Sequence, residues 1–581
     1  MKFHEVSTAF AAIAATSSRT EITQLLTALL QKASAEEARS ISYLSLGLLR
    51  PAYEGTQFNL ADRSVKKILA DLLELPEEKI TALARETGDL GEVAAQGTWR
   101  VHTHLTVHEV FDALQALETI SGKGSQEERA QEFSKLLKKL EPEGASLVVR
   151  MVLGKLRLGF SDMTLIDALS WMLVGDKSLH QKIENAYNLC ADIGHIAYLL
   201  KKHGIHAFDH VAIVVGVPIR PAAAERLPTA QAIIDKIGHC VAQPKLDGFR
   251  LQVHIDNRGS KQVIRFFSRN LQDMSAMFPE LVEALQELPV KSCIFEGEAI
   301  LYDEATKTFA PFQETVKRKR KHNVDEMAKE LPLRLFAFDL LYLDGQSLLD
   351  EEHQSRRRQL VHLIKQVKSD VIQVDAEKEI TTAKELENYF LEEVGAGLEG
   401  LVVKRIHAHY QPGKRNFNWI KLKRQEHGDL EDTLDTVILG YYAGKGKRAR
   451  FGIGAFLVGV YNKKQDRFET VAKVGSGLTD IEWHELKKRC DDLEVKKQPH
   501  NVVCSKDLAP DVWIEPSIVV MIRADEITRS PVHTAGQTKD ELGFALRFPR
   551  MMGYRSDKSA TEATTTQELV PLFEHQRSMV L

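Results

Sequence analysis

The chain has 581 residues, 43% hydrophobic and 27% charged, which is typical of a soluble globular protein but too long for one core. We therefore expect about three domains. Lys and Arg number 77 against 81 Asp and Glu, giving a net charge of −4, which excludes a generally basic nucleic-acid-binding protein. Any contact with nucleic acid must come from local clusters of positive charge.

The chain up to about residue 205 has the pattern of a helical domain. Branched apolar residues recur at positions 22, 25, 26, 29 and 30, and again at 65, 68, 69, 72 and 73, which is the spacing of one helix face. Basic residues recur between these helices, and composition alone favours solvated faces over phosphate contacts for them. These residues are Arg50, Arg150, Lys155 and Arg157.

From about residue 208, strands alternate with helices. We expect one helix near 278–288 and another that begins at Thr382, where Glu385 completes a capping box. Glycines at 395 and 397 end this helix, and a strand follows at 401–403.

From about residue 430, short strands dominate. One helix near 479–490 interrupts them, with Thr479 and Glu482 as its capping box. About five strands and one helix suit a small barrel of the OB type. A basic, mobile loop is expected at 444–450 between the first two strands, and the predicted strands cover residues 437–441, 455–461, 468–474 and 518–523.

The central stretch of the chain reads K-x-D-G-x-R and begins at Lys245. Residues 249–256 alternate apolar with polar, which predicts a half-buried strand. Pro244 and Gly248 place Lys245 on a bend between two strands, from which its side chain can point into a cleft. Taken alone, this pattern leaves a solvated surface lysine open as the alternative.

Further stretches carry charged residues inside apolar strands. Carboxylates rarely lie in such strands unless they are paired or bind a metal, and two lysines two residues apart share one strand face. For each stretch alone, core packing or a salt bridge is the favoured interpretation. The stretches cover residues 267–270, 295–300, 335–342, 399–404 and 419–423.

Together these stretches describe one site with a candidate nucleophilic lysine, two acidic positions, an aromatic platform and several cations. Clustered positive charge lowers the pKa of a lysine and makes it nucleophilic near neutral pH. The same cations stabilise charge that develops on a phosphate, and two carboxylates could hold magnesium. The chain has no G-x-x-x-x-G-K-[ST] sequence, so a P-loop mechanism is not expected.

The motifs KLDGFR, FSRN, FEGEAI, LFAFDLLYLDG, EGLVVK, WIKLK and ALRFPR occur in this order. In this respect the chain resembles the ATP-dependent DNA ligases of the archaeal and eukaryotic replicative type, which belong to the covalent nucleotidyltransferases. The sequences LRPAY at 49–53 and LRLG at 156–159 also resemble the helical DNA-binding domain of that family.

The resemblance implies a multidomain fold. It consists of an all-α DNA-binding domain at 1–205, an α+β nucleotidyltransferase (adenylation) domain at 206–428 and a C-terminal β-barrel OB-fold domain with a tail at 429–581. The implied activity is ligation of 5′-phosphate/3′-hydroxyl nicks in duplex DNA, with ATP and Mg²⁺, in replication, repair and recombination. The reaction passes through a lysyl-AMP intermediate and an adenylylated DNA intermediate.

The resemblance also assigns roles to individual residues. Lys245 is the implied nucleophile, Glu298 and Glu399 the magnesium ligands, and Phe338 the ring that stacks on adenine. Arg269, Arg50 and Arg157 are the implied DNA contacts. The remaining nucleotide-binding positions are Gln243, Arg250, Glu298, Lys404, Arg415, Lys421, Lys423, Arg547 and Arg550.

One position departs from the family pattern. Two residues before the lysine the family often has Glu, which reads the adenine amino group, whereas this chain has Gln243. An amide carbonyl can accept the same hydrogen bond, but an amide also donates, so strict selection of ATP does not follow.

Rival assignments remain within and outside the superfamily. An mRNA capping enzyme or an RNA ligase would not be expected to carry the helical first third, and an NAD-dependent DNA ligase would be expected to have a four-cysteine zinc site. None of the five cysteines here forms a C-x-x-C pair. A catalytically silent nick-binding scaffold would be expected to lack some of the charged motif residues, all of which are present.

The expected partner is nicked duplex DNA, bound by a monomer. A C-terminal sliding-clamp peptide is the weaker alternative to a plain tail, because Gln567, Val570 and Phe573 match part of such a peptide but Glu574 replaces its second aromatic residue. No apolar run approaches the length of a membrane span, and we expect a cytoplasmic protein of the prokaryotic cytosol or nucleoid.

Overall fold

The structure is a computed structural model that describes residues 1–101, 104–156, 158–303, 308–310, 314–315, 317–318, 324–423, 433–444, 446–538 and 540–578. It contains two compact units, which are described separately below. One comprises Met1–Ser64 with Thr98–Arg424, and the other comprises Val65–Gly97 with Gln425–Leu581.

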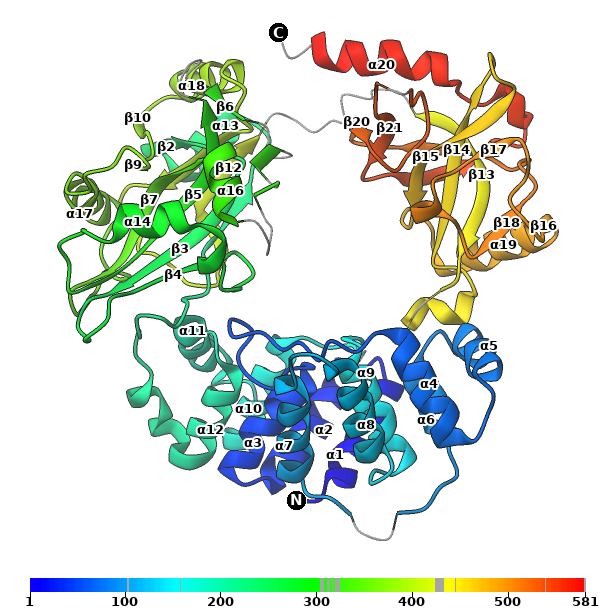
Figure 1. Cartoon of the computed structure of the whole chain (residues 1–581). Helices are drawn as coiled ribbons and strands as arrows, with labels where there is room; N and C mark the ends of the chain where they lie inside the picture. Colours follow the sequence, from blue (N-terminus) through cyan, green and yellow to red (C-terminus); the bar gives the residue numbers. More distant parts are fainter. Residues whose placement is uncertain are drawn as a thin grey trace. The chain divides into compact units, whose positions relative to one another are not determined.

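The first third of the chain is helical, as predicted (Figure 1). Within the first unit α2 packs on α10, α3 on α12 and α1 on α9. The segment Val65–Gly97, which holds most of α4 and all of α5 and α6, belongs to the second unit. The helices are α1 (Phe3–Ala15), α2 (Arg19–Lys32), α3 (Ala35–Ser45), α4 (Asp62–Leu73), α5 (Glu77–Thr87), α6 (Leu90–Ala95), α7 (Val107–Thr119), α8 (Ser125–Leu137), α9 (Pro142–Val152), α10 (Asp162–Val174), α11 (His180–Cys190) and α12 (Ile193–His203).

The rest of the first unit contains two β-sheets. The five-stranded sheet has the order β1-β12-β11-β2-β10, and the seven-stranded sheet has the order β4-β3-β5-β7-β8, with β6 on β5 and β9 on β7. The strands are β1 (Ala223–Arg226), β2 (Cys240–Pro244), β3 (Phe249–Asp256), β4 (Val263–Ser268), β5 (Ser292–Asp303), β6 (Thr308–Phe309), β7 (Leu333–Leu343), β8 (Gln346–Ser347), β9 (Ile372–Val374), β10 (Lys378–Ile380), β11 (Gly400–Arg405) and β12 (Arg415–Lys423).

Helices cover the outer faces of both sheets. Apolar residues of α14 and α17 join the core of the seven-stranded sheet, and those of α13 and α18 join the core of the five-stranded sheet. A third cluster, which includes Ile294 of β5, Leu341 of β7 and Trp419 of β12, packs the two sheets against each other. The helices of this region are α13 (Ala230–Ile237), α14 (Pro279–Leu285), α16 (Val324–Glu330), α17 (His353–Ile364) and α18 (Ala383–Gly395).

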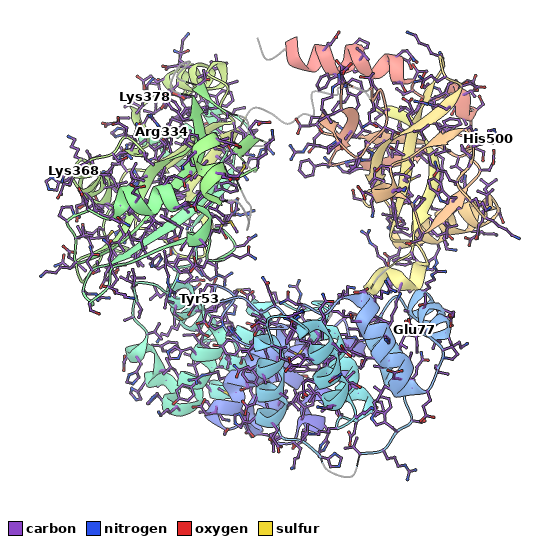
Figure 2. All side chains as sticks on the ribbon, in the orientation of Figure 1. Tyr53, Glu77, Arg334, Lys368, Lys378 and His500 are labelled. Carbon is purple, nitrogen blue, oxygen red and sulfur yellow. The ribbon has the colours of Figure 1, made fainter. Side chains whose placement is uncertain are left out.

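The helical region contacts this sheet region within the first unit. Tyr53, labelled in Figure 2, packs edge-on against Phe267 of β4 at a centroid distance of 6.2 Å. Lys414 forms an ion pair with Glu184 of α11. These contacts join elements far apart in the sequence.

The prediction that β3 is half-buried is wrong. Its apolar residues face the core as expected, but Gln252 and His254 on the other face are also buried, at 4% and 1% exposure. That face points into the layer between the two sheets, where the backbone N–H groups of Ile219 and Gly216 donate to the two side chains. Burial lowers the pKa of His254 to about 3.

Strands predominate over helices in the part of the second unit that follows residue 433. An eight-stranded sheet has the order β16-β18-β13-β14-β15-β17, with β19 beside β13 and β22, and β20 pairs with β21. The elements are β13 (Leu434–Tyr442), β14 (Ala455–Asn462), β15 (Arg467–Val474), α19 (Asp480–Asp491), β16 (Glu494–Val495), β17 (Val502–Val503), β18 (Val512–Ile514), β19 (Val519–Arg523), β20 (Glu526–Ser530), β21 (Gly543–Arg547), β22 (Arg550–Tyr554) and α20 (Thr566–Ser578).

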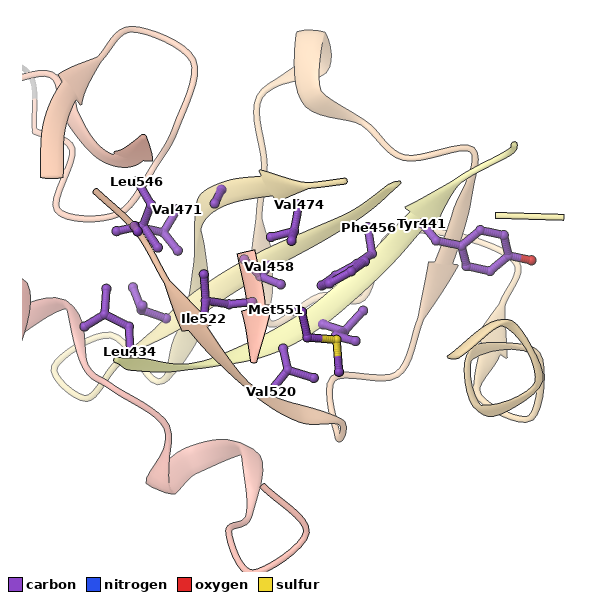
Figure 3. Packing of buried hydrophobic residues seen from close by; sticks show 14 of the residues in the cluster. Leu434, Tyr441, Phe456, Val458, Val471, Val474, Val520, Ile522, Leu546 and Met551 are labelled. Carbon is purple, nitrogen blue, oxygen red and sulfur yellow. The ribbon is translucent and has the colours of Figure 1, made fainter. Parts of the chain in front are cut away.

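The curled sheet of this unit encloses an apolar core. Figure 3 shows side chains from β13, β14, β15, β19 and β22 converging inside it, among them Leu434, Phe456 and Val520. Helix α20 adds Leu569 to this core, and Phe573 packs against Phe544 at a centroid distance of 5.2 Å. Phe573, one of the three residues that match a clamp peptide, therefore packs α20 against β21.

The local helix signals are confirmed. Thr382 caps α18 and Thr479 caps α19, each with the predicted capping box. The basic stretch at 444–450 contains a short 3₁₀ turn, Gly446–Phe451, and its Lys445 lies outside the described residues. Within the described part of the chain, no helix is long and apolar enough to span a membrane.

Lys245 lies on a bend between β2 and β3, as predicted, and this bend takes the chain from one sheet to the other. The bend passes close to β5, where a Cβ atom on Gly248 would lie 2.3 Å from the carbonyl oxygen of Ala299. The Gly248 amide also donates to Oε1 of Glu298 at 3.1 Å. A side chain at position 248 would therefore move the segment that carries Lys245.

We predict that Gly248→Ala lowers the free energy of unfolding by about 1–3 kcal/mol, the usual cost of overpacking. Gly395→Ala is the matched control, since a Cβ atom there meets nothing within 4 Å and the residue ends a helix. It should be neutral or stabilising by up to ~1 kcal/mol. Thermal unfolding of both variants measures this, and equal stability of the two would contradict the close approach.

Candidate active site

A cavity of about 760 Å³ lies in the first unit and is lined by residues from both sheets. Its walls come from β1, β2, β3, β5, β7, β11 and β12 and from residues just after β4. Ten of the residues predicted from sequence line it. They are Gln243, Lys245, Arg250, Arg269, Glu298, Phe338, Glu399, Lys404, Lys421 and Lys423.

Lys245 is anchored by the strand beside it. Its backbone N–H donates to the carbonyl of Gly400 at 2.8 Å, and its Nζ pairs with Oε2 of Glu399. The other oxygen of Glu399 pairs with Nζ of Lys423. The Lys245 side chain is 22% exposed, so it is held by the protein and still open to the cavity.

Glu298 provides a second carboxylate at the cavity wall. Burial raises its pKa to about 7, although Lys245 and Arg250 act in the opposite direction. The folded protein therefore disfavours the charge on Glu298 in the absence of any ligand. A carboxylate whose charged form is destabilised by burial in this way is typical of a functional site rather than of a stabilising ion pair.

Arg250 is fixed at the back of the cavity. Its guanidinium donates to the carbonyl oxygen of Ala222 at 2.7 Å and to Oε2 of Glu296 at 2.8 Å. Glu296 is fully buried and also accepts a hydrogen bond from the Tyr410 hydroxyl at 2.8 Å. The sequence predicts that the acidic residues of β5 are paired or bind a metal. Glu296 is indeed paired, through its ion pair with Arg250.

Aromatic rings and buried cations meet at one end of the cavity. The Lys404 ammonium lies 4.2 Å from the ring centroid of Trp419 and 5.0 Å from that of Phe338. Burial lowers the pKa of Lys404 to about 8. The sequence analysis did not single out Trp419, although Trp419, Lys421 and Lys423 alternate along β12 and so share one face.

Asp375 is a second cavity residue that the sequence analysis missed. It follows β9, is 5% exposed, and burial raises the pKa of its carboxyl group well above the usual value. No local pattern in the sequence marks this residue, because the pairing of β9 with β7 brings it to the cavity.

Other predicted residues lie elsewhere. Arg415 lines a second cavity, of about 970 Å³, near Tyr410. Arg50 pairs with Glu118 at 2.5 Å, and Arg157 lies outside the described residues.

The two arginines of the ALRFPR motif belong to the second unit and pair with acidic neighbours there. Arg547 contacts Glu526 at 3.0 Å and Arg550 contacts Asp525 at 2.7 Å. Their side chains are 48% and 54% exposed.

Comparison with known proteins finds relatives over the full length of the chain. A probable DNA ligase of Dictyoglomus thermophilum is 44% identical over 579 residues, which cover 99% of this chain and 98% of that protein. The chain belongs to the ATP-dependent DNA ligase family. A DNA ligase 1 of Methanosarcina acetivorans is 35% identical over 99% of this chain and 100% of its own length.

Three family models of this ligase family match successive parts of the chain. The DNA ligase N terminus matches residues 2–170, the ATP dependent DNA ligase domain 221–423, and the ATP dependent DNA ligase C terminal region 449–558. The solved structure described as Pmar-Lig_PreS3 shares the fold with a TM-score of 0.58 at 17% identity, covering 95% of this chain and 99% of that one. The chain is thus an ATP-using enzyme that joins DNA.

The charge on Glu298 generates a prediction about stability and pH. A raised pKa in the folded state means that stability is greatest while the group is protonated and is lost as the pH rises from about 4.5 to about 7. We expect Glu298→Gln to raise the free energy of unfolding at pH 8 by on the order of 1 kcal/mol, after allowance for partial exposure, and by much less at pH 5.

The matched control is Glu283→Gln, on the exposed face of α14. This substitution should change the free energy of unfolding by the same small amount at both pH values. Thermal unfolding at pH 5 and pH 8 provides the measurement. A loss of stability at pH 8 would mean that Glu298 is a structural ion-pair partner of Lys245 and Arg250.

Proposed function

We propose that the 760 Å³ cavity is the adenylation site and that Lys245 is its nucleophile. The observation that carries this proposal is the position of Lys245, open to a cavity that is also lined by several other cations and by the rings of Phe338 and Trp419. This volume lies in the range of pockets that hold small-molecule ligands, and a nucleotide has an anionic end and an aromatic end.

In the first step the neutral Nζ of Lys245 attacks the α-phosphorus of ATP. A nitrogen–phosphorus bond forms, the bond to the pyrophosphate oxygen breaks, and one of the two amine protons passes to solvent. The 5′-phosphate of a nick then displaces Lys245 from AMP. Finally the 3′-hydroxyl attacks the activated 5′-phosphate, AMP leaves, and a phosphodiester bond closes the nick.

The cavity residues divide by the part of the nucleotide they suit. Phe338, with Trp419 beside it, suits the adenine ring, and Gln243 suits its edge. Arg250 and Glu298 suit the ribose or phosphates. The cavity cations assigned to phosphates are Lys404, Lys421, Lys423 and Arg269. Arg415, which lines the second cavity, is assigned to phosphates as well, and the nick is an alternative contact for the two arginines.

Magnesium is the metal we assign to this reaction. In the part of the chain that the structure describes, no group of three or more His, Cys, Asp or Glu side chains could hold a metal ion. Mg²⁺ is usually bound by one or two carboxylates together with substrate phosphates and water, and the carboxylates of Glu298 and Glu399 line the cavity. Glu298 and Glu399 would hold it, and it would supply positive charge to the reacting phosphates.

We further propose the domain limits 1–205, 206–428 and 429–581, with DNA binding by the first and an OB fold for the last. The joining segment near 425–432 lies outside the described residues. The substrate is nicked duplex DNA, gripped mainly through phosphates by residues such as Arg50 and Arg157, and the enzyme acts as a monomer in replication, repair and recombination. Its location is the cytoplasm, and a plain C-terminal tail is favoured over a clamp peptide.

The nucleophile is tested directly by substitution. Lys245→Ala should abolish the AMP adduct, because the other lysines that line the cavity, Lys404, Lys421 and Lys423, are assigned to the phosphates and not to the attack. Lys245→Arg should fail since a guanidinium stays protonated. A denaturing gel after incubation with radiolabelled ATP measures the adduct. Binding of nicked DNA by Lys245→Ala should persist, and a labelled Lys245→Ala band would refute the assignment.

Arg547 and Arg550 should act in one step only. In the family the ALRFPR motif closes over the nucleotide and orients pyrophosphate, so we expect Arg547→Ala or Arg550→Ala to block self-adenylylation. The same variants should still seal a nick whose 5′-phosphate already carries AMP. Rates with ATP and with the adenylylated nick measure the two steps.

Glu526→Ala is the control for Arg547. It removes the same ion pair, Arg547–Glu526, while leaving the arginine in place. Self-adenylylation should persist in this variant. Equal loss of both reactions in Arg547→Ala and Arg550→Ala would instead mark the arginines as structural or DNA-binding residues.

A further inference from the structure

Gln243 occupies the position where the family often has Glu. It lies in β2, is 2% exposed and lines the cavity. The two ends of a glutamine amide have opposite hydrogen-bonding character, since the nitrogen donates and the oxygen accepts. Which end faces the nucleotide therefore decides which base the residue can read.

Glu377 lies directly beside this amide. Its Oε2 accepts a hydrogen bond from Nε2 of Gln243 at 2.7 Å and lies 2.9 Å from Nε2 of His353. Strand β10 runs antiparallel to β2 with Lys378, labelled in Figure 2, opposite Ala242. The next position in that register brings Glu377 opposite Gln243.

The charge on Glu377 fixes the orientation of the amide. Burial raises its pKa, but the hydrogen bond from His353 and the charges of His353, Arg357 and Lys404 outweigh burial and hold the pKa below the usual value. Glu377 is thus a carboxylate, which only accepts hydrogen bonds. The amide nitrogen of Gln243 must face it, and the carbonyl oxygen is the end left for the cavity.

We propose that Glu377 is a positioning residue that, through Gln243, makes the site select adenine over guanine nucleotides. A carbonyl oxygen accepts a hydrogen bond from the exocyclic amino group of adenine, whereas guanine presents a carbonyl oxygen at the same place. An unconstrained glutamine could rotate and pair with either base. The inference rests on the proposed adenylation site, and it assigns to two residues together the reading that one Glu performs elsewhere in the family.

The first test is Glu377→Gln. An amide at position 377 can donate as well as accept, so only the longer contact of the Gln243 amide nitrogen with the Phe338 carbonyl oxygen, at 3.5 Å, still favours the original orientation. We expect kcat/KM for self-nucleotidylation to rise with GTP and to fall with ATP through KM rather than kcat, reducing the ATP preference by roughly tenfold or more. Adduct formation with α-labelled ATP and GTP, over a range of concentrations, measures the ratio.

The reciprocal swap is the decisive control. Gln243→Glu alone would set two carboxylates opposite each other, which should weaken ATP binding and lower the melting temperature. Gln243→Glu combined with Glu377→Gln restores one donor facing one carboxylate. We expect this double variant to recover the ATP preference to within about threefold of the parent protein.

The outcomes separate this inference from the proposed function. If the unaltered protein forms no adduct with any nucleoside triphosphate, the adenylation site itself is wrong. If Glu377→Gln forms adducts with an unchanged ATP:GTP ratio, the inference is overturned while the function stands. If Glu377→Gln does not fold, the double variant provides the test. A double variant that folds but shows no preference for ATP over GTP would mean that Glu377 is only a structural partner of His353 and Arg357.

Discussion

The site depends on one backbone constraint, the close passage of the bend after β2 against β5. Here the chain leaves the five-stranded sheet and enters the seven-stranded one, and only a residue without a side chain fits beside the Ala299 carbonyl. The amide of Gly248 is thereby brought to Glu298, and Lys245 is held between the sheets by its bond to Gly400. The proposed nucleophile, on a junction between two sheets, can therefore be reached by side chains from both.

Buried ion pairs keep the walls of the cavity in place. Arg356, fully buried, donates through Nε and Nη2 to the two oxygens of Asp339 at 2.7 and 3.1 Å. The charges on Arg356 and Lys404 hold the pKa of the Asp339 carboxyl far below its usual range despite burial. Removing one member of such a pair leaves an uncompensated charge, which costs more than the pair itself contributes. Phe338, next to Asp339 in β7, is therefore carried by a strand that cannot readily shift.

The sequence predicts local features and the motif residues, but it does not predict partners that strand pairing supplies. Helix caps at Thr382 and Thr479 are local signals, and the structure bears them out. The half-buried prediction for β3 fails because the segment that covers its polar face precedes it by more than thirty positions, as the Ile219–Gln252 hydrogen bond shows. Glu377 meets Gln243 across 134 positions, a contact that depends on β10 pairing with β2. No periodicity within either segment contains that information.

Burial also distinguishes arginines that stay in place from arginines that can exchange partners. The Arg250–Glu296 pair is nearly closed to solvent, so neither group can leave the other without a large desolvation cost. The Arg547–Glu526 and Arg550–Asp525 pairs are open to solvent on the arginine side, where an ion pair contributes only about 0–1 kcal/mol. A phosphate that offers two oxygens to a guanidinium competes easily with such a pair. The arginines of the second unit can therefore exchange partners, as their proposed role in binding pyrophosphate requires, whereas Arg250 stays paired with Glu296.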